Sequence, residues 1–115
     1  MSKGLKSYRY GRSLEYRLMR MLREKDNCVC VRSAGSHTPI DIIAGNGNQV
    51  WGIQVKGGKR PYISRKDLEE LAEWCNKLKI QPLVAVYRKG KRWEFYTVAG
   101  YMLTHADELD IRGGM

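Results

Sequence analysis

The most informative absence in this sequence of 115 residues is that of any long hydrophobic run. No stretch approaches the roughly 18–20 consecutive apolar residues that are needed to span a membrane. The basic N-terminus is not followed by an apolar segment, so no secretory signal peptide is predicted. We therefore expect a cytoplasmic protein without a membrane partner.

Cysteines are also few, and their arrangement disfavours a disulfide framework or a metal cluster. Cys28, Cys30 and Cys75 are odd in number and lack the spacing of metal ligands. Ordinary reduced thiols are the favoured interpretation. The chain shows no internal repeat and no domain boundary, and its length fits one domain over residues 1–115 with a single modest core.

Acidic residues are scarce relative to basic ones, with 12 Asp and Glu against 21 Lys and Arg, a net charge of +9. Three of the acidic residues lie within residues 101–115, so the rest of the chain is more basic still. A compact basic body implies a polyanionic partner, and nucleic acid is the first choice. A membrane surface is disfavoured, because no helix pairs a basic face with a bulky apolar one.

Hydrophobic periodicity predicts two helices. Residues 13–25 carry an apolar stripe at i, i+4, i+7 and i+8 that starts at Leu14, with Ser13 as the expected cap. A second helix is expected to begin at Ser64, with Asp67 placed as in a capping box.

The two ends of the chain are expected to lie outside these elements. Residues 1–12 are polar and basic and predict a flexible arm, for which phosphate contact and a solvated terminus are equally good interpretations. Residues 101–115 predict a C-terminal tail, in which Thr104 and Asp107 would cap a last helical turn.

Five strands are expected from short apolar runs bounded by turn residues. The runs lie in residues 28–31, in the two halves of 39–56, and in 82–87 and 93–98. Between the two halves, Gly45-Asn46-Gly47-Asn48 supplies the positive φ angles of a hairpin turn. The order helix, three strands, helix, two strands predicts an α/β sheet covered by helices.

Polar side chains interrupt the predicted hairpin at three positions. Asp41 opens the first strand, whereas Gln54 and Lys56 lie two residues apart in the second and therefore share one face. Burying a carboxylate, an amide and an ammonium in a small apolar sheet is costly unless they serve a purpose. This cluster is the candidate site. The structural alternatives are a turn residue at Asp41 and an exposed strand end at Lys56.

An ordered set of segments across most of residues 4–98 resembles a known family. The segments are GRSLEYRLMRML, VRSAGS, PIDIIAGNG, IQVKGG, and PLVAVY with RWEFY. Asp41 after a proline and Gln54-Val55-Lys56 at the end of the next strand resemble the PD-(D/E)xK nucleases. The whole set is similar to the archaeal-type Holliday junction resolvases, which some viruses also carry. The resemblance implies a restriction-endonuclease-like fold, a mixed five-stranded sheet flanked by helices.

The sequence departs from the family pattern at two positions. Ile40 separates Pro39 from Asp41, where the name-giving motif has the two residues adjacent. Gln54 stands where the family usually has glutamate. This removes one carboxylate from the implied metal site, but an amide oxygen is still a hard ligand for Mg²⁺.

The resemblance implies a homodimeric, structure-specific endonuclease that resolves four-way DNA junctions by metal-dependent symmetric nicking. Asp41, the Gln54 amide oxygen and the Val55 carbonyl would bind Mg²⁺, with Mn²⁺ as a substitute. Glu15, in the first helix, would hold a second ion or a water beside the metal. Lys56 would position or activate the attacking water, or stabilise the phosphoryl charge. No small-molecule cofactor is implied.

Contacts with DNA are expected from basic and hydroxylic residues around this site. By the resemblance, Arg32 and Ser36 would contact phosphate near the cleaved strand, and Arg17 is a weaker candidate. The remaining candidates lie in the basic arm and in the basic loop after the lysine strand: Arg12, Lys59 and Arg60.

Two other functions remain open from the sequence. The first is another endonuclease of the same fold that acts on duplex, flap or branched DNA. The second is a junction-binding protein in which Gln54 marks a decayed site, although Glu15, Asp41 and Lys56 are all present. The candidates for the dimer surface are Trp74, Tyr96 and Met102.

Overall fold

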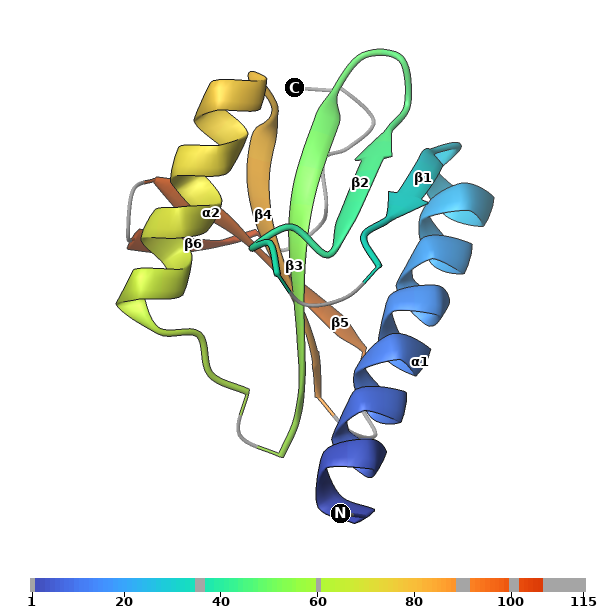
Figure 1. Ribbon diagram of the computed structural model, residues 1–115. Coiled ribbons are helices and arrows are strands. Elements are labelled where there is room, and N and C mark those ends of the chain that lie inside the picture. Colours follow the sequence, from blue (N-terminus) through green and yellow to red (C-terminus); the bar gives the residue numbers. More distant parts are fainter. Residues whose placement is uncertain (1, 35–36, 60, 89–91, 100–101, 107–115) are drawn as a thin grey trace.

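The computed structural model describes residues 2–34, 37–59, 61–88, 92–99 and 102–106, which form two helices and one six-stranded sheet (Figure 1). The helices are α1 (Ser2–Asp26) and α2 (Arg65–Leu78). The strands are β1 (Val29–Arg32), β2 (Ile42–Gly45), β3 (Val50–Gly58), β4 (Gln81–Arg88), β5 (Trp93–Ala99) and β6 (Met102–Ala106). No helix within these ranges is long and apolar enough to cross a membrane.

The strands lie in the sheet in their order along the chain, and only the central pair, β3 and β4, runs parallel. A parallel pair requires a crossover connection, which α2 provides. The two strands pair over eight residues, from Trp51 opposite Gln81 to Gly58 opposite Arg88. The predicted mixed α/β sheet flanked by helices is therefore confirmed.

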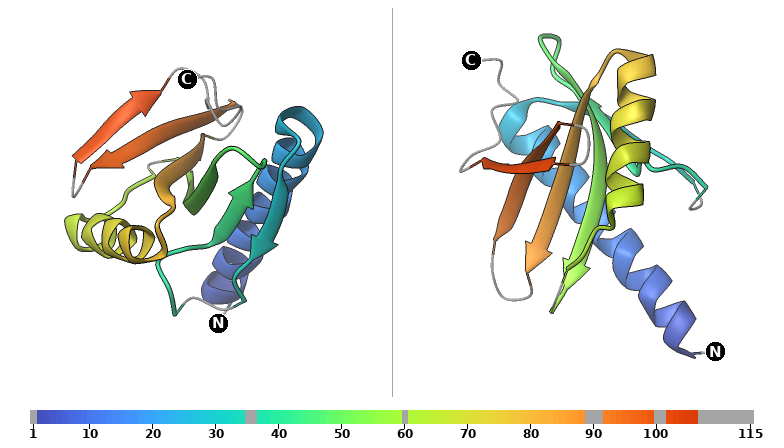
Figure 2. Two further views of the ribbon diagram at one scale, coloured as in Figure 1. Left: turned by 90° about the horizontal axis from the view of Figure 1, so that it is seen from above. Right: turned by 90° about the vertical axis from the view of Figure 1, so that its left-hand side faces the viewer.

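The two helices cover opposite faces of the sheet, which lies between them in Figure 2. On one face, Leu18 and Leu22 of α1 share a buried cluster with Ile53 of β3. On the other face, Leu71 of α2 shares a second cluster with Val84 of β4. Both clusters consist of apolar side chains, as expected for helices that each bury one stripe.

Side chains of β3 alternate between these two faces. Ile53 and Val55 belong to the cluster beneath α1. Gln54 and Lys56 therefore point to the face that carries α2, on the same side as each other, as the sequence predicts. This placement brings the polar end of β3 beside the loop that leads into α2.

Local sequence signals explain the central hairpin and the start of α2. The side-chain oxygen of Asn46 accepts the N–H groups of Asn48 and Gln49, both at 2.9 Å, and Gly47 has a φ of 96°. At the helix, Ser64 Oγ accepts the Asp67 N–H at 3.0 Å. The predicted hairpin turn and helix cap are confirmed.

The prediction of a flexible arm over residues 1–12 is wrong from Ser2 onwards, because α1 begins there. The apolar stripe that includes Leu14 extends one turn upstream to Tyr10. Both side chains lie against Gly57 of β3, where an added Cβ would collide with Leu14 and lie 3.4 Å from the Tyr10 ring. Helices in proteins are stabilised mainly by such packing, which the polar composition of the segment does not reveal.

The prediction of a C-terminal tail with a last helical turn is also wrong where the structure describes the tail. Met102–Ala106 forms β6, which pairs antiparallel with β5. Thr104, interpreted as a helix cap, is a strand residue opposite Thr97. Strand formation depends on such a partner more than on local preference. The sheet thus has six strands instead of five, and Asp107 lies outside the described residues.

Candidate active site

The candidate site lies where β2 parts from β3. The register of the pair ends with Ile42 opposite Ile53, and the preceding residue, Asp41, donates its N–H to the Ile53 carbonyl at 2.8 Å. Beyond this point β2 no longer pairs with β3. The Asp41 side chain bonds to the backbone of β3 instead, since its Oδ2 accepts the Val55 N–H at 2.8 Å. The hairpin therefore fixes the carboxylate against the backbone of β3.

Two further oxygen atoms belong to the same place. The N–H and C=O of one residue in an extended strand point to the same side, so the Val55 carbonyl points to the side of Asp41. Gln54 is the residue of β3 directly before Val55, and its side chain points to the face that carries α2. Gln54 Oε1 is buried and has no hydrogen-bond partner among the described groups. Such an atom requires an explanation, and a bound ion is one.

The charge state of Asp41 reflects this environment. Burial raises the pKa of Asp41 to about 6; the Val55 N–H partly offsets this, and the Glu15 charge adds to it. The cations of Lys56 and Arg32 lower the same pKa, so all three charged side chains lie around the carboxylate. A carboxylate whose ionised form is disfavoured by burial gains from a nearby cation.

Glu15 and Arg32 form an ion pair at the edge of the site. Arg32 Nε donates to Glu15 Oε1 at 2.7 Å, and the two side chains are only 18% and 16% exposed. The Arg32 guanidinium also lies over the ring of Tyr16, 5.1 Å from its centroid. The sequence assigned Glu15 and Arg32 to separate tasks, whereas the structure holds them together between α1 and the end of β1.

The oxygen donors fit a hard divalent cation. Asp41, Gln54 and the Val55 carbonyl supply only oxygen, which Mg²⁺ prefers, and Mg²⁺ usually keeps several waters besides a few protein ligands. The buried, unpartnered Gln54 Oε1 fits the same ion. Within the described ranges no three His, Cys, Asp or Glu side chains are grouped to hold a metal, as expected where glutamine replaces a carboxylate.

The predicted DNA-binding residues that the structure describes come from several elements: Arg12 and Arg17 from α1, Arg32 from β1, and Lys59 from the loop after β3. Arg17 is exposed, and its guanidinium lies 5.1 Å from the centroid of the Tyr87 ring. Arg12 and Lys59 are also exposed. Ser36 and Arg60 lie outside the described residues, and their roles stay predictions.

The structure adds Tyr16, which the sequence did not single out. Tyr16 lines a hollow of about 350 Å³ with Ser13, Arg17 and Arg20, on the exposed side of α1. The only sequence signal for Tyr16 is its place beside Glu15, off the apolar stripe of the helix. Aromatic rings under two arginines hold those guanidinium groups in place by cation–π contact.

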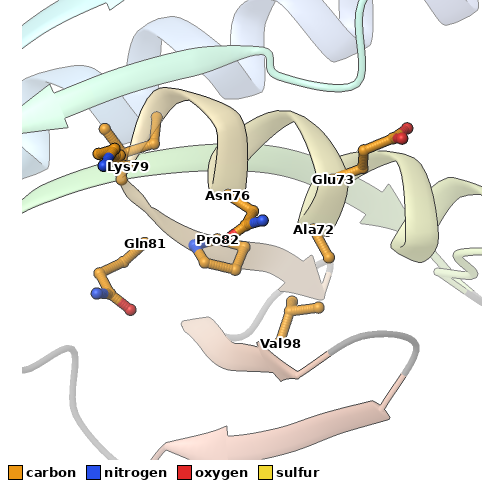
Figure 3. A pocket seen from close by; sticks show the side chains of 8 residues that line it. Ala72, Glu73, Asn76, Lys79, Gln81, Pro82 and Val98 are labelled. Carbon is orange, nitrogen blue, oxygen red and sulfur yellow. The ribbon is translucent and has the colours of Figure 1, made fainter.

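A wider hollow of about 820 Å³ lies at the other end of α2, against the start of β4 (Figure 3). Its lining mixes Glu73, Asn76, Lys79 and Gln81 with apolar side chains, and it includes none of the residues around Asp41. Its charges are balanced, so it does not extend the basic surface.

The fold and the site together define a class of protein. A sheet between two helices, with a carboxylate, an amide and a lysine at the parting of a hairpin, is the arrangement that the resemblance to PD-(D/E)xK nucleases predicts. A family model described as archaeal Holliday junction resolvase (Hjc) matches residues 6–112. The chain therefore belongs to this family of junction-resolving nucleases, which confirms the family inferred from the sequence.

A solved structure supports the same assignment. The structure of Hjc from Archaeoglobus fulgidus, a Holliday junction resolvase of an archaeal hyperthermophile, is similar to this chain with a TM-score of 0.64. The two sequences are 30% identical over 72% of this chain and 73% of the other.

Proposed function

We propose that this protein resolves four-way DNA junctions by nicking two symmetry-related strands with the help of Mg²⁺, for which Mn²⁺ can substitute. The observation that carries the proposal is the Asp41 carboxylate held at the Val55 N–H, 2.8 Å away, together with the buried Oε1 of the preceding residue, Gln54, which has no hydrogen-bond partner among the described groups. The substrate is inferred from family membership, and the position of the reaction is inferred from these atoms.

The metal would be held by Asp41, Gln54 Oε1 and the Val55 carbonyl. When bound, Mg²⁺ neutralises charge on the phosphoryl oxygens and favours ionisation of water. The protein's part is to keep these oxygens in place: β3 holds Val55, and the Val55 N–H holds the carboxylate. Lys56 lies on the same face as Gln54 and would stabilise the developing phosphoryl charge.

The Glu15–Arg32 pair would position the scissile phosphate. Arg32 presents its N–H groups in a planar fork whose geometry matches phosphate oxygens, and its Nε donates to Glu15. Glu15 would orient this fork through Oε1 and hold the attacking water through Oε2. The pair thus joins the two tasks that the sequence assigned separately.

We further propose a homodimer, since symmetric nicking needs two sites related by a two-fold axis. Its surface would be the exposed apolar side chains on β1 and α2, which are Val29, Val31, Trp74 and Leu78. They adjoin a hollow of about 220 Å³ lined partly by Val31, Trp74 and Leu78. Contiguous apolar patches of this kind mark interfaces.

The other two candidates for the dimer surface are less suitable. Tyr96 packs against the cluster beneath α2, and its hydroxyl donates to Glu94 at 3.0 Å. The side chain of Met102 lies outside the described residues. We also propose a cytoplasmic location, which the preference for reduced cysteines supports.

The first test is cleavage of a synthetic four-way junction beside a matched linear duplex and a flap, with and without Mg²⁺. We expect paired nicks at symmetric positions in the junction alone. Gln54→Glu, run in parallel, should lower the Mg²⁺ concentration needed for half-maximal cleavage, because it adds a charge to the metal site. Equal cutting of the duplex would indicate another endonuclease, and binding without cleavage in both proteins would indicate a junction-binding relative.

A further inference from the structure

A pocket of about 290 Å³ opens beside Lys56, on the face of the sheet that carries α2. It lies between the sheet and the loop that runs from β3 to α2. Residues from four strands and this loop line it: Lys56, Pro61, Tyr62, Ile63, Val84, Val86, Arg88, Tyr96 and Leu103. Lys56 is the one lining residue that also belongs to the candidate active site.

The walls of this pocket are apolar and aromatic. Val84 and Val86 of β4 are buried and belong to the cluster beneath α2. Tyr62 lines the same pocket, and the residue is 76% exposed. A ring so exposed gains from stacking on a flat apolar group, because it can bury area with few side-chain torsions to fix.

One carboxylate, that of Glu94, holds two of the lining residues, Arg88 and Tyr96, in place. Glu94 Oε1 accepts from Tyr96 Oη and from Arg88 Nε, each at 3.0 Å. These bonds fix the Tyr96 ring and the position of the Arg88 guanidinium before any ligand arrives. The pocket thus has apolar and aromatic walls, one of them held by hydrogen bonds, and two basic residues, Lys56 and Arg88, line it.

We propose that this pocket receives an unpaired nucleobase next to the scissile phosphate of a junction, with Tyr62 as its stacking partner; this rests on the proposed function. Three observations favour a base. The pocket is at the small end of ligand sites, which suits a single ring system. Its walls are aromatic and apolar, and the Lys56 cation in its lining complements a phosphate next to the base. Through Lys56 it is continuous with the site of cleavage.

The pocket gives the enzyme a means to select junctions by shape. A base in continuous duplex must be unstacked and unpaired before it can enter, whereas bases at the exchange point of a junction are more easily released. Stacking of the released base on Tyr62 then favours binding to a junction over a continuous duplex, whatever the base sequence. Removal of one such contact weakens single-stranded binding by roughly 5- to 150-fold.

The test compares wild type, Tyr62→Ala and Tyr62→Phe in single-turnover nicking of an intact junction. It also uses two junctions that carry an abasic residue on the 5′ or the 3′ side of the nicked phosphate. On the intact junction, we expect Tyr62→Ala to slow nicking by roughly 5- to 150-fold and Tyr62→Phe to stay near wild type. On one abasic junction, wild type should fall to the rate of Tyr62→Ala, and the substitution should have no further effect.

Other outcomes overturn the proposal. If Tyr62→Ala nicks the intact junction as fast as wild type, base stacking is excluded. It is also excluded if Tyr62→Ala is slower than wild type by the same factor on both abasic junctions as on the intact one. A shift of the monomer–dimer equilibrium by Tyr62→Ala would assign the pocket to the second copy of the chain instead.

A failure of the proposed function is distinguishable from a failure of this pocket. If wild type binds the junction but never nicks it, the proposed function fails. The pocket is then judged by 2-aminopurine placed at the exchange point. Quenching of its fluorescence by wild type and by Tyr62→Phe, but not by Tyr62→Ala, supports the base pocket, and equal fluorescence in all three overturns it.

Discussion

The two helices of this protein differ in charge as much as in length. α1 has 25 residues with eight basic and three acidic side chains, a net +5, and no acidic residue in its first turn. α2 has 14 residues with three basic and four acidic side chains, a net −1. Its exposed side carries the ion pairs Arg65–Glu69 and Glu73–Lys77, at 3.4 and 4.0 Å. The helices thus cover opposite faces of one sheet with opposite electrostatics.

This difference assigns the helices different partners. The net positive charge of α1 suits phosphates, and its Glu15 forms an ion pair with Arg32 at the candidate site. Four of the seven charged side chains of α2 form ion pairs along the helix, and its exposed apolar residues Trp74 and Leu78 suit a protein surface. We therefore expect substitutions in α1 to change DNA cleavage and binding, and substitutions in α2 to change assembly and stability.

The largest effect is expected for Glu15→Gln, compared with Glu69→Gln in α2. Loss of the Glu15 charge weakens the ion pair with Arg32 and, in the proposed mechanism, removes the contact for the attacking water. Removal of one preorganised polar contact of an active site costs roughly 10²–10³ in rate. Single-turnover nicking of a junction should slow by that factor in Glu15→Gln and by less than about twofold in Glu69→Gln.

The same pair of variants has a readout that is independent of cleavage. Glu15 raises the pKa of Asp41, so Glu15→Gln should move that pKa below its value of about 6, and Glu69→Gln should leave it in place. Carbon-detected NMR titration of Asp41 in EDTA measures this directly. An unchanged Asp41 titration in Glu15→Gln would show that α1 is not electrically coupled to the site.

The sequence predicted those parts of the site that one hairpin assembles. Gln54 and Lys56 alternate within β3, and Asp41 directly precedes β2, which a turn with a clear signal joins to β3, so the hairpin pattern placed the three residues together. The Glu15–Arg32 pair joins residues 17 positions apart across a helix and a strand, and no local pattern encodes its 2.7 Å contact. The pocket beside Lys56 was missed for the same reason, since its lining comes from four strands and a loop.

The next largest effect is expected for Trp74→Ala in α2. A buried tryptophan at the centre of an interface contributes at least about 2 kcal/mol, so the dimer dissociation constant should rise roughly thirtyfold. Analytical ultracentrifugation over a range of concentrations measures it. Arg20→Gln in α1 is the matched control and should leave the constant unchanged. If Trp74→Ala and wild type have the same dimer dissociation constant, the interface does not include α2.

A smaller effect is expected for the double variant Arg17→Gln/Arg20→Gln, compared with Arg65→Gln/Lys66→Gln in α2. Each phosphate contact adds roughly 0.9 to the slope of log K against log salt concentration. The α1 variant should therefore lower the slope for junction binding by about 2, and the α2 variant should not change it. Fluorescence anisotropy between about 50 and 200 mM salt tests this. If the slope falls equally in both variants, the claim that α1 contacts phosphates and α2 does not is wrong.

The smallest effect concerns two serines that the sequence interpreted alike, as helix caps. Ser64 does cap α2 through its bond to the Asp67 N–H, whereas Ser13 lies inside α1, eleven residues after the helix begins at Ser2. Ser64→Ala should therefore destabilise the protein by about 1 kcal/mol. Ser13→Ala should be neutral or stabilise it by up to roughly 0.5 kcal/mol, because alanine favours a helix interior over serine. Urea unfolding measures both, and a clear loss in Ser13→Ala would mean that the helix in solution starts at Ser13 and that the preceding residues are the arm the sequence suggested.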